Sequence, residues 1–221
     1  MSWGVFRGFG RLALVQDTMR GDTVLHGTLT VRGGIPGARF DERLETWMER
    51  EGLRSYRYIQ RTRYPRFSRD RAREFFPDER RWTGHTNNRQ EEGELPTTRP
   101  LDELAFLFVA RTLPLEIGTE IQLDDYWKPS GNPVRLQVLR REVVKVPAGT
   151  FTCIVVRPII KTSGIFGEDG EAEVFFSEGP YRQLVMLKAK VSIATLTLRL
   201  EEFTPGAPQQ SGAHDLGSTN R

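Results

Sequence analysis

Arginines interleaved with aromatic residues make the segment between residues 50 and 89 the part of the chain with the clearest capacity to bind a ligand. Twelve arginines lie there against five acidic residues, and seven Tyr, Phe and Trp side chains are mixed with them. Guanidinium groups recognise phosphates and carboxylates, and rings beside them can stack on bases. The candidate residues for a ligand or partner surface are Arg57, Arg61, Arg71, Arg73 and Trp82.

A structural role within a sheet also accounts for these arginines, and strand register favours it. If residues 53–63 and 66–76 form a hairpin around Tyr64-Pro65, a two-residue loop places Tyr58 opposite Arg71, where a cation–π contact can form. A loop one residue longer places arginines opposite arginines, which is destabilising. We therefore predict the shorter register and a largely structural arginine ladder. Contact with a polyanion or acidic surface and a clamp for a small ligand remain the alternatives.

Other chemistry-bearing residues are dispersed. His26, His85 and His214 have no metal-ligand spacing, and Cys153 is the single cysteine, so we expect no metal site and a buried thiol. The adjacent carboxylates Asp124-Asp125 point to opposite faces if they lie on a strand, which indicates a solvated strand end. The sequence contains no nucleophile-elbow, P-loop or Ser-x-x-Lys motif. It therefore predicts no catalytic residues, no cofactor and no metal.

Strand patterns dominate the elements that must position the arginines. Alternating or β-branched apolar residues predict strands in the second half at 134–138, 144–146, 150–157, 171–177, 184–190 and 192–202. The first half reads similarly at 3–15, 23–32, 40–50, 53–63 and 67–76. Segment 40–50 has the composition of a helix, but its apolar stripe is thin, and we predict a strand there.

One helix is predicted over residues 100–111, where Leu101, Leu104, Ala105 and Phe108 follow helical spacing. The polar residues 85–98 before it predict a loop. From residue 204 the chain is rich in Pro, Gly, Ser and Gln, which predicts a disordered tail over 204–221.

These elements predict a mainly β fold, with residues 1–203 as a single β-rich domain. We expect a curved antiparallel meander of about ten strands, a half-barrel or a flattened barrel, with one short packed helix. The predicted core residues are Phe106, Phe108, Val138, Phe151, Ile154, Val156, Val174, Phe176, Leu196 and Leu198.

Composition fits a globular domain of this kind. The 221 residues are 38% hydrophobic and 28% charged, the net charge is +3, and no apolar run approaches the length of a transmembrane helix. Of 32 basic residues 27 are arginines, which a GC-rich genome would also favour. Nucleic acid is therefore an unlikely partner, and composition predicts no oligomeric state.

Several short sequence motifs resemble those of a known bacterial family. A short helix ends in Arg111, Val146-Pro-Ala-Gly-Thr-Phe151 forms a turn, and Glu173-Val-Phe-Phe-Ser-Glu178 is followed by Arg182. In the first half Asp41-Glu-Arg-Leu-Glu-Thr-Trp47 is similar to the family's strand that ends in Ser-Trp. This order resembles domain of unknown function 3108, over about residues 3 to 203.

The resemblance implies a β-rich exported protein of the bacterial cell envelope, with no established reaction and no catalytic residues to carry over. It implies a location in the periplasm or cell envelope. The printed chain has no signal peptide at its N-terminus, so we expect a trimmed chain or a misassigned start codon. The leading hypothesis is a non-enzymatic envelope protein that binds a lipid, glycan or protein partner on a curved sheet. The alternatives are an enzyme acting on an envelope polymer, and a polyanion or nucleic-acid binder that uses the region from Arg50 to Arg89.

Overall fold

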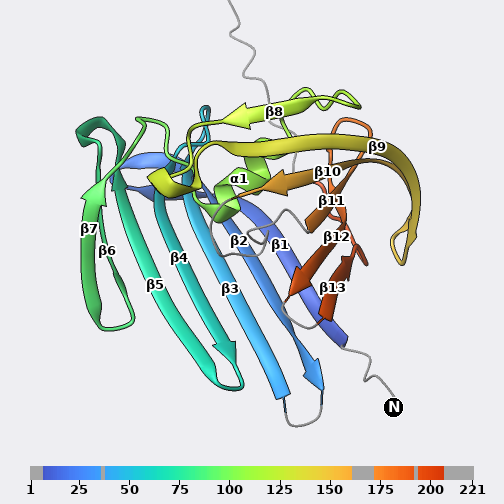
Figure 1. Ribbon diagram of the computed structural model, residues 1–221, viewed down its shortest axis with the longest axis horizontal. Coiled ribbons are helices and arrows are strands. Elements are labelled where there is room, and N and C mark those ends of the chain that lie inside the picture. Colours follow the sequence, from blue (N-terminus) through green and yellow to red (C-terminus); the bar gives the residue numbers. More distant parts are fainter. Residues whose placement is uncertain (1–6, 36–37, 161–171, 192–193, 207–221) are drawn as a thin grey trace, which may run out of the picture.

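The computed structural model describes residues 7–35, 38–160, 172–191 and 194–206, and within them the chain forms two antiparallel sheets and one α-helix (Figure 1). The mainly β prediction is confirmed. Among the described strands neither sheet closes on itself, and the strands divide between two sheets instead of forming one sheet of about ten.

The first sheet is a seven-stranded meander in which each strand pairs with the next along the chain. Its strands are β1 (Arg7–Met19), β2 (Asp22–Ile35), β3 (Ala38–Glu49), β4 (Ser55–Tyr64), β5 (Phe67–Phe76), β6 (Arg81–Thr86) and β7 (Arg89–Glu94), with a 3-10 turn η1 (Pro77–Glu79) after β5. The β1–β2 hairpin turns at Arg20 and Gly21, both with positive φ, as a tight hairpin turn requires.

The second sheet has the order β13-β12-β11-β10-β9-β8. Its strands are β8 (Glu120–Leu123), β9 (Val134–Val146), β10 (Gly149–Ile159), β11 (Ala172–Ser177), β12 (Leu184–Val191) and β13 (Ala194–Arg199), with a 3-10 turn η2 (Pro129–Gly131) between β8 and β9. The two strand segments predicted at 134–138 and 144–146 are one long, curved strand, β9 (Figure 1).

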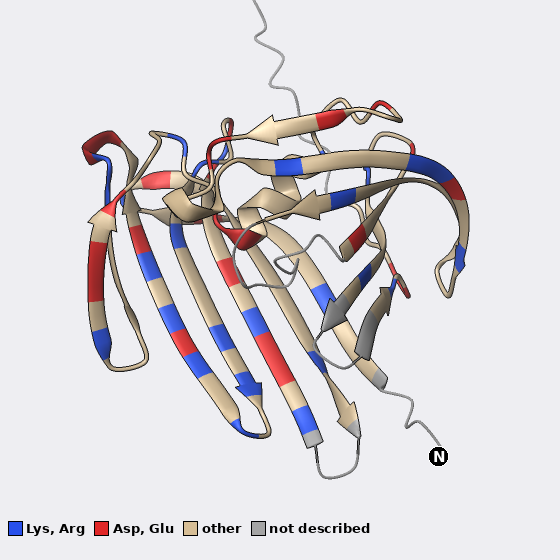
Figure 2. Cartoon of the chain, in the orientation of Figure 1, with Lys and Arg blue, Asp and Glu red and all other residues tan. Residues whose placement is uncertain are grey.

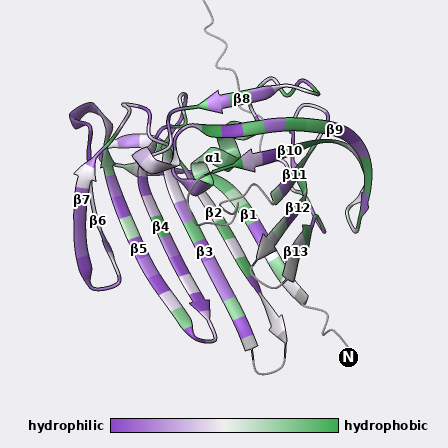
Figure 3. Ribbon diagram, in the orientation of Figure 1, coloured by the Kyte–Doolittle hydropathy of each residue, from purple (hydrophilic) through white to green (hydrophobic). Residues whose placement is uncertain are grey.

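The helix α1 (Glu103–Ala110) packs against β2 and β3 and carries buried residues on all sides. A Cβ built at Gly27 of β2 would lie 2.5 Å from a ring carbon of Phe108, so the missing side chain lets the helix approach the sheet. One cluster of buried hydrophobic side chains includes residues of the first sheet, of α1 and of the second sheet, among them Leu44, Phe106 and Val138. The hydrophobic colouring of α1 and of parts of β9 follows this core (Figure 3).

The helix is shorter than predicted. Asp102 is its N-cap, and Oδ1 of Asp102 accepts hydrogen bonds from the backbone N–H groups of Leu104 and Ala105 at 2.8 and 2.9 Å. Residues 100–101 therefore precede the helix instead of forming its first turn. Within the described ranges the structure contains no helix with the length and hydrophobicity of a transmembrane segment.

Two other predictions need correction or completion. The loop predicted at 85–98 is wrong, because most of it lies in β6 and β7, which form a hairpin at the edge of the first sheet. The strand predicted at 40–50 is confirmed as β3.

Of the predicted core, the fully buried side chains are Phe106, Phe108, Val138, Val156, Val174 and Phe176. Partly buried are Phe151, Ile154 and Leu198, whereas the side chain of Leu196 and residues 207–221 of the predicted tail lie outside the described residues.

Candidate functional site

Strand alternation places three arginines of β5 on one face of the first sheet. Side chains two residues apart on a strand point the same way, so Arg69, Arg71 and Arg73 share a face. The buried Phe75 lies on the same face of β5 and belongs to the hydrophobic core. This face therefore turns toward the interior of the molecule.

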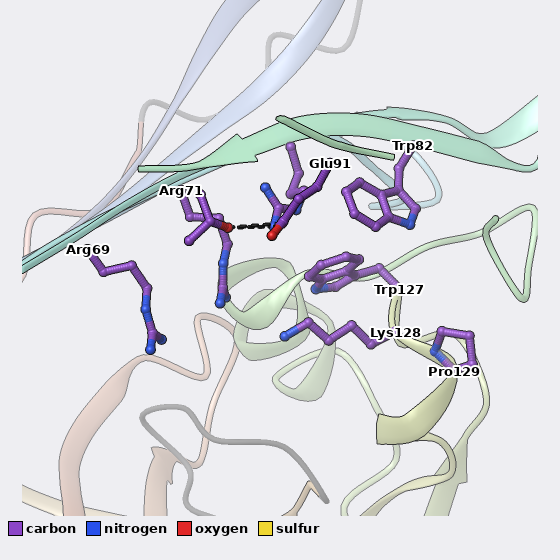
Figure 4. A pocket seen from close by; sticks show the side chains of 9 residues that line it. Arg69, Arg71, Trp82, Glu91, Trp127, Lys128 and Pro129 are labelled. Atoms are coloured by element: carbon purple, nitrogen blue, oxygen red, sulfur yellow. Dashed lines mark hydrogen bonds and ion pairs between the residues drawn. The ribbon is translucent and has the colours of Figure 1, made fainter. Parts of the chain in front are cut away.

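The three arginines line a pocket together with residues from two other parts of the chain (Figure 4). Its volume is about 380 Å³, within the range of sites for small ligands. Strands β6 and β7 contribute one wall, and the segment between β8 and η2 contributes the other. The lining residues are Arg69, Arg71, Arg73, Trp82, Thr86, Glu91, Trp127, Lys128 and Pro129.

Arg73 is held by the protein through both terminal nitrogens of its guanidinium, whereas its buried Nε has no hydrogen-bond partner among the described residues. Only 3% of its side chain is exposed, and its guanidinium donates to the backbone oxygens of Ala72 and His85 at 2.8 and 2.6 Å. It also donates to the hydroxyl of Thr86 at 2.9 Å and forms an ion pair with Glu91. Burial lowers the pKa of Arg73, against the opposing effect of Glu91. We assign Arg73 to the support of the pocket wall.

Two tryptophans pack edge to face beside this guanidinium. The ring centroids of Trp82 and Trp127 are 5.3 Å apart at an interplanar angle of 83°. The Arg73 guanidinium lies 4.8 Å from the Trp82 centroid and 5.6 Å from that of Trp127. A Cβ at Gly93 of β7 would stand 2.8 Å from the indole nitrogen of Trp82, so glycine makes room for this ring.

Arg71 keeps a donor that no group in the described part of the chain accepts. Its Nη1 donates to the Gln60 side-chain oxygen at 3.3 Å and lies 3.8 Å from Oε1 of Glu103 on α1. Its Nε is buried without a hydrogen-bond partner in the described part of the chain. Glu103 is itself 8% exposed and accepts the hydroxyl proton of Tyr126 at 2.9 Å. Arg71 is therefore only partly neutralised.

Arg69 and Lys128 have no carboxylate within 4.0 Å among the described residues. Arg69 lies over the ring of Phe67 at 4.9 Å, and the Lys128 ammonium lies 4.8 Å from the Trp127 centroid. Burial lowers the pKa of Lys128; Glu103 opposes this effect, and the neighbouring arginines of β5 add to it. An anion in the pocket would relieve this crowding of positive charge.

The indole nitrogen of Trp127 is a further unused donor. Trp127 is 2% exposed, and its Nε1 has no hydrogen-bond partner within the residues described. In Figure 4 this nitrogen lies on the edge of the ring nearer to Lys128. A buried donor without an acceptor is costly, and a ligand oxygen in the pocket would supply one.

The structure brings together three of the five candidate residues predicted from sequence. Arg71, Arg73 and Trp82 line the pocket. Arg57 lies on the opposite face of the sheet, where its Nε is 2.5 Å from Glu74 and its guanidinium lies over Trp47. Arg61 is exposed and lies opposite Asp70 in the register of β4 and β5.

The predicted hairpin register is wrong by two residues. The turn is Pro65-Arg66, and Tyr58 lies opposite Arg73, not Arg71. A shift of two keeps every side chain on its face, but it changes the cross-strand partners. The cation–π partners of Arg73 are the two tryptophans, in place of a tyrosine on β4.

Half of the twelve arginines between residues 50 and 89, all of them described, form ion pairs with carboxylates. These are Arg54, Arg57, Arg63, Arg71, Arg73 and Arg81. Blue and red residues along β3, β4 and β5 show this mixture of charges (Figure 2). Acidic neighbours thus absorb much of the arginine excess, as the ladder interpretation expects.

No group of three or more His, Cys, Asp or Glu side chains that could hold a metal occurs among the residues described. The prediction that Cys153 is buried is confirmed, because its side chain is inaccessible. Burial raises the pKa of its thiol to about 11.

The fold and the pocket define a two-sheet antiparallel β protein with a cationic, aromatic-lined cavity. The chain belongs to the family described as protein of unknown function (DUF3108), whose model matches residues 1–201. It is similar in fold to the crystal structure of a β-barrel-like protein of domain of unknown function DUF1849 from Brucella abortus, at 8% identity and a TM-score of 0.47, over 85% of this chain and 84% of that one. No curated protein matches the sequence.

Proposed function

We propose that this protein is a non-enzymatic binding protein of the bacterial cell envelope that holds an anionic ligand in the pocket between β5 and Lys128. The observation that carries the proposal is the convergence of three cations on one cavity: Arg69 and Lys128 have no ion pair among the described residues, and Arg71 has a buried Nε without a partner there. The envelope location rests on the resemblance described above.

The charge balance of the pocket supports an anion as the ligand. Four cations line it against the single carboxylate of Glu91, and Glu103 behind Arg71 is the second carboxylate nearby. Two positive charges therefore remain without a counter-ion among the residues that the structure describes. Arginine and lysine in a partly water-excluded site bind carboxylates and phosphates through charge-assisted hydrogen bonds.

The opposite face of the same sheet offers a weaker site. There Arg57 and Arg63 are held by Glu74 and Asp70 at 2.5 and 2.6 Å. These pairs would have to open before an anion could bind, whereas Arg69 and Lys128 have no ion pair to lose within the described ranges. The pocket is thus the stronger candidate for the ligand surface.

Isothermal titration with sodium phosphate and with sodium acetate, at low and constant ionic strength, tests the proposal. The decisive variant is Arg69→Gln combined with Lys128→Gln, since neither residue has an ion pair with any described residue whose loss would unfold the protein. The matched control is Arg199→Gln, which removes an exposed positive charge on β13.

The wild type and the control should bind at least one anion with affinities within about twofold of each other. The double variant should bind about tenfold more weakly, the effect of about 1.4 kcal/mol. The proposal fails if neither anion binds, or if the double variant binds as well as the control.

A further inference from the structure

The donors of the pocket approach from several directions, and this arrangement bears on the shape of the ligand group. Arg69 and Arg71 project from β5, while Lys128 and the Trp127 indole come from the opposite wall (Figure 4). A planar carboxylate is satisfied by the fork of a single guanidinium. Donors on opposite walls suit a group whose oxygens point in several directions, as those of a tetrahedral phosphate do.

The charge of the pocket bears on the charge of that group. The charged residues around it are Arg69, Arg71 and Arg73 on β5, Glu91 on β7, Glu103 on α1 and Lys128 after β8. Arg73 is paired with Glu91, and Arg71 shares Glu103 at 3.8 Å. The remaining excess of two positive charges is neutralised by a dianion and only half neutralised by a monoanion.

From these two observations we propose that the pocket recognises a phosphate monoester in its dianionic form. This inference rests on the proposed anion-binding function and names the class of its ligand. Each phosphate oxygen can accept from one of the unused donors, on Arg71, Arg69, Lys128 and Trp127. The cavity of about 380 Å³ leaves room for part of the group that the phosphate esterifies.

Three small anions separate charge from shape in the test. Methyl phosphate has a second pKa near 6, so it is mainly dianionic at pH 7.5 and monoanionic at pH 5.0. Dimethyl phosphate is tetrahedral but monoanionic at both pH values, and acetate is planar and monoanionic. Because dimethyl phosphate keeps its charge, any effect of titrating the protein itself appears with it as well.

At pH 7.5 methyl phosphate should bind at least about tenfold more tightly than dimethyl phosphate or acetate, because a second charge faces two unpaired cations. At pH 5.0 this preference should fall to about threefold or less. The Lys128→Gln variant should lose the preference at pH 7.5, and Arg199→Gln should keep it.

The failures of the inference and of the proposed function are distinguishable. If the three anions bind the wild type within about threefold of one another at pH 7.5, the inference is wrong and the anion-binding function stands. If none of them binds, the proposed function itself fails.

Vesicles distinguish a lipid headgroup from a free phosphate ester. Flotation uses phosphatidylcholine vesicles that carry either phosphatidic acid, a monoester, or phosphatidylglycerol, a diester. Recruitment by phosphatidic acid alone, reversed by methyl phosphate, supports the inference with a lipid as the source. Binding of methyl phosphate without recruitment supports it with a soluble ester. Recruitment that methyl phosphate does not reverse contradicts it.

Discussion

Arg73 provides the sharpest test of how the pocket is built, because its substitution should act on stability. The change Arg73→Met keeps most of the side-chain volume and removes the charge and four hydrogen bonds to Ala72, His85, Thr86 and Glu91. Breaking a buried ion pair by removing one partner costs about 3–5 kcal/mol. Glu91 is 29% exposed and can regain water, so we expect the lower end, about 3 kcal/mol.

Urea unfolding followed by circular dichroism measures this loss. For a chain of this length, about 3 kcal/mol corresponds to a fall in melting temperature of about 6–12 °C. The matched control is Arg61→Met on the neighbouring strand, which is exposed on the opposite face and should change stability by less than about 0.5 kcal/mol.

A double-mutant cycle tests whether the loss of the Arg73–Glu91 ion pair causes this fall in stability. Glu91→Gln alone leaves the buried guanidinium without its counter-ion, so the double variant should cost less than the sum of the single variants, with a coupling of about 1.5–3 kcal/mol. A loss below about 1 kcal/mol for Arg73→Met, or additive effects in the cycle, would refute the structural role of this residue.

Three further predictions concern the packing around the helix and the buried cysteine. Burial raises the pKa of Asp102 to about 7, so the folded state keeps a proton that the unfolded chain has lost. Stability should therefore fall as pH rises from about 4 to about 7, and Asp102→Asn should flatten the change in urea midpoint between pH 5 and 8. Cys153, buried and with a thiol pKa of about 11, should react with a disulfide reagent at pH 8 only in urea, and rapid labelling of the folded protein would contradict this. Gly27→Ala should cost about 1–3 kcal/mol because its Cβ would meet Phe108 at 2.5 Å, whereas Gly10→Ala, whose nearest contact is 3.7 Å, should not.

The sequence predicts most strands because their apolar residues alternate or cluster. This apolar pattern does not predict the hairpin of β6 and β7, and the reason is physical. It lies at the edge of the sheet, and residues such as Arg89, Glu91 and Glu94 give no apolar period, since β7 exposes one face and buries the other only in part. Charged residues suit an edge strand because they discourage pairing with other chains. The turn residues Asn87-Asn88, the first with positive φ, are the available signal.

The register of the central hairpin depends on where its turn lies, and local sequence leaves two choices. The predicted register places Pro65 at the last turn position, whereas in the structure it occupies the first, as its fixed φ favours. The rule that arginines should not face arginines correctly excludes registers shifted by an odd number of residues from the predicted one. It does not exclude a register shifted by two residues. A register shifted by two residues still places Arg57 and Arg61 on the face opposite Arg71 and Arg73. The alternation of side chains along the strands is therefore enough to separate these two pairs.

Trp127 and Lys128 could not be assigned to the pocket from the sequence. They lie outside the arginine-rich segment, on the connection that follows β8, which is held by backbone hydrogen bonds between residues 125–127 and Leu101 in front of the helix. No spacing rule links them to Arg71. What the sequence offers is an aromatic next to one of only five lysines in the chain, a signal shared by many surface turns.

Three arginines at alternate positions of one strand thus have three different roles, and each role depends on a partner from elsewhere in the chain. Glu91 of β7 neutralises Arg73, and Glu103 of α1 partly neutralises Arg71. Among the described residues Arg69 contacts the ring of Phe67 and has no carboxylate partner. The neutralisation of these arginines by carboxylates therefore decreases along β5, from Arg73 beside the tryptophans to Arg69 near the hairpin turn. A bound anion gains most from the least neutralised cations, Arg69 and Lys128, and need not compete with Glu91. Binding should therefore leave the Arg73–Glu91 pair intact, which separates the residues that hold the pocket together from those that hold its ligand.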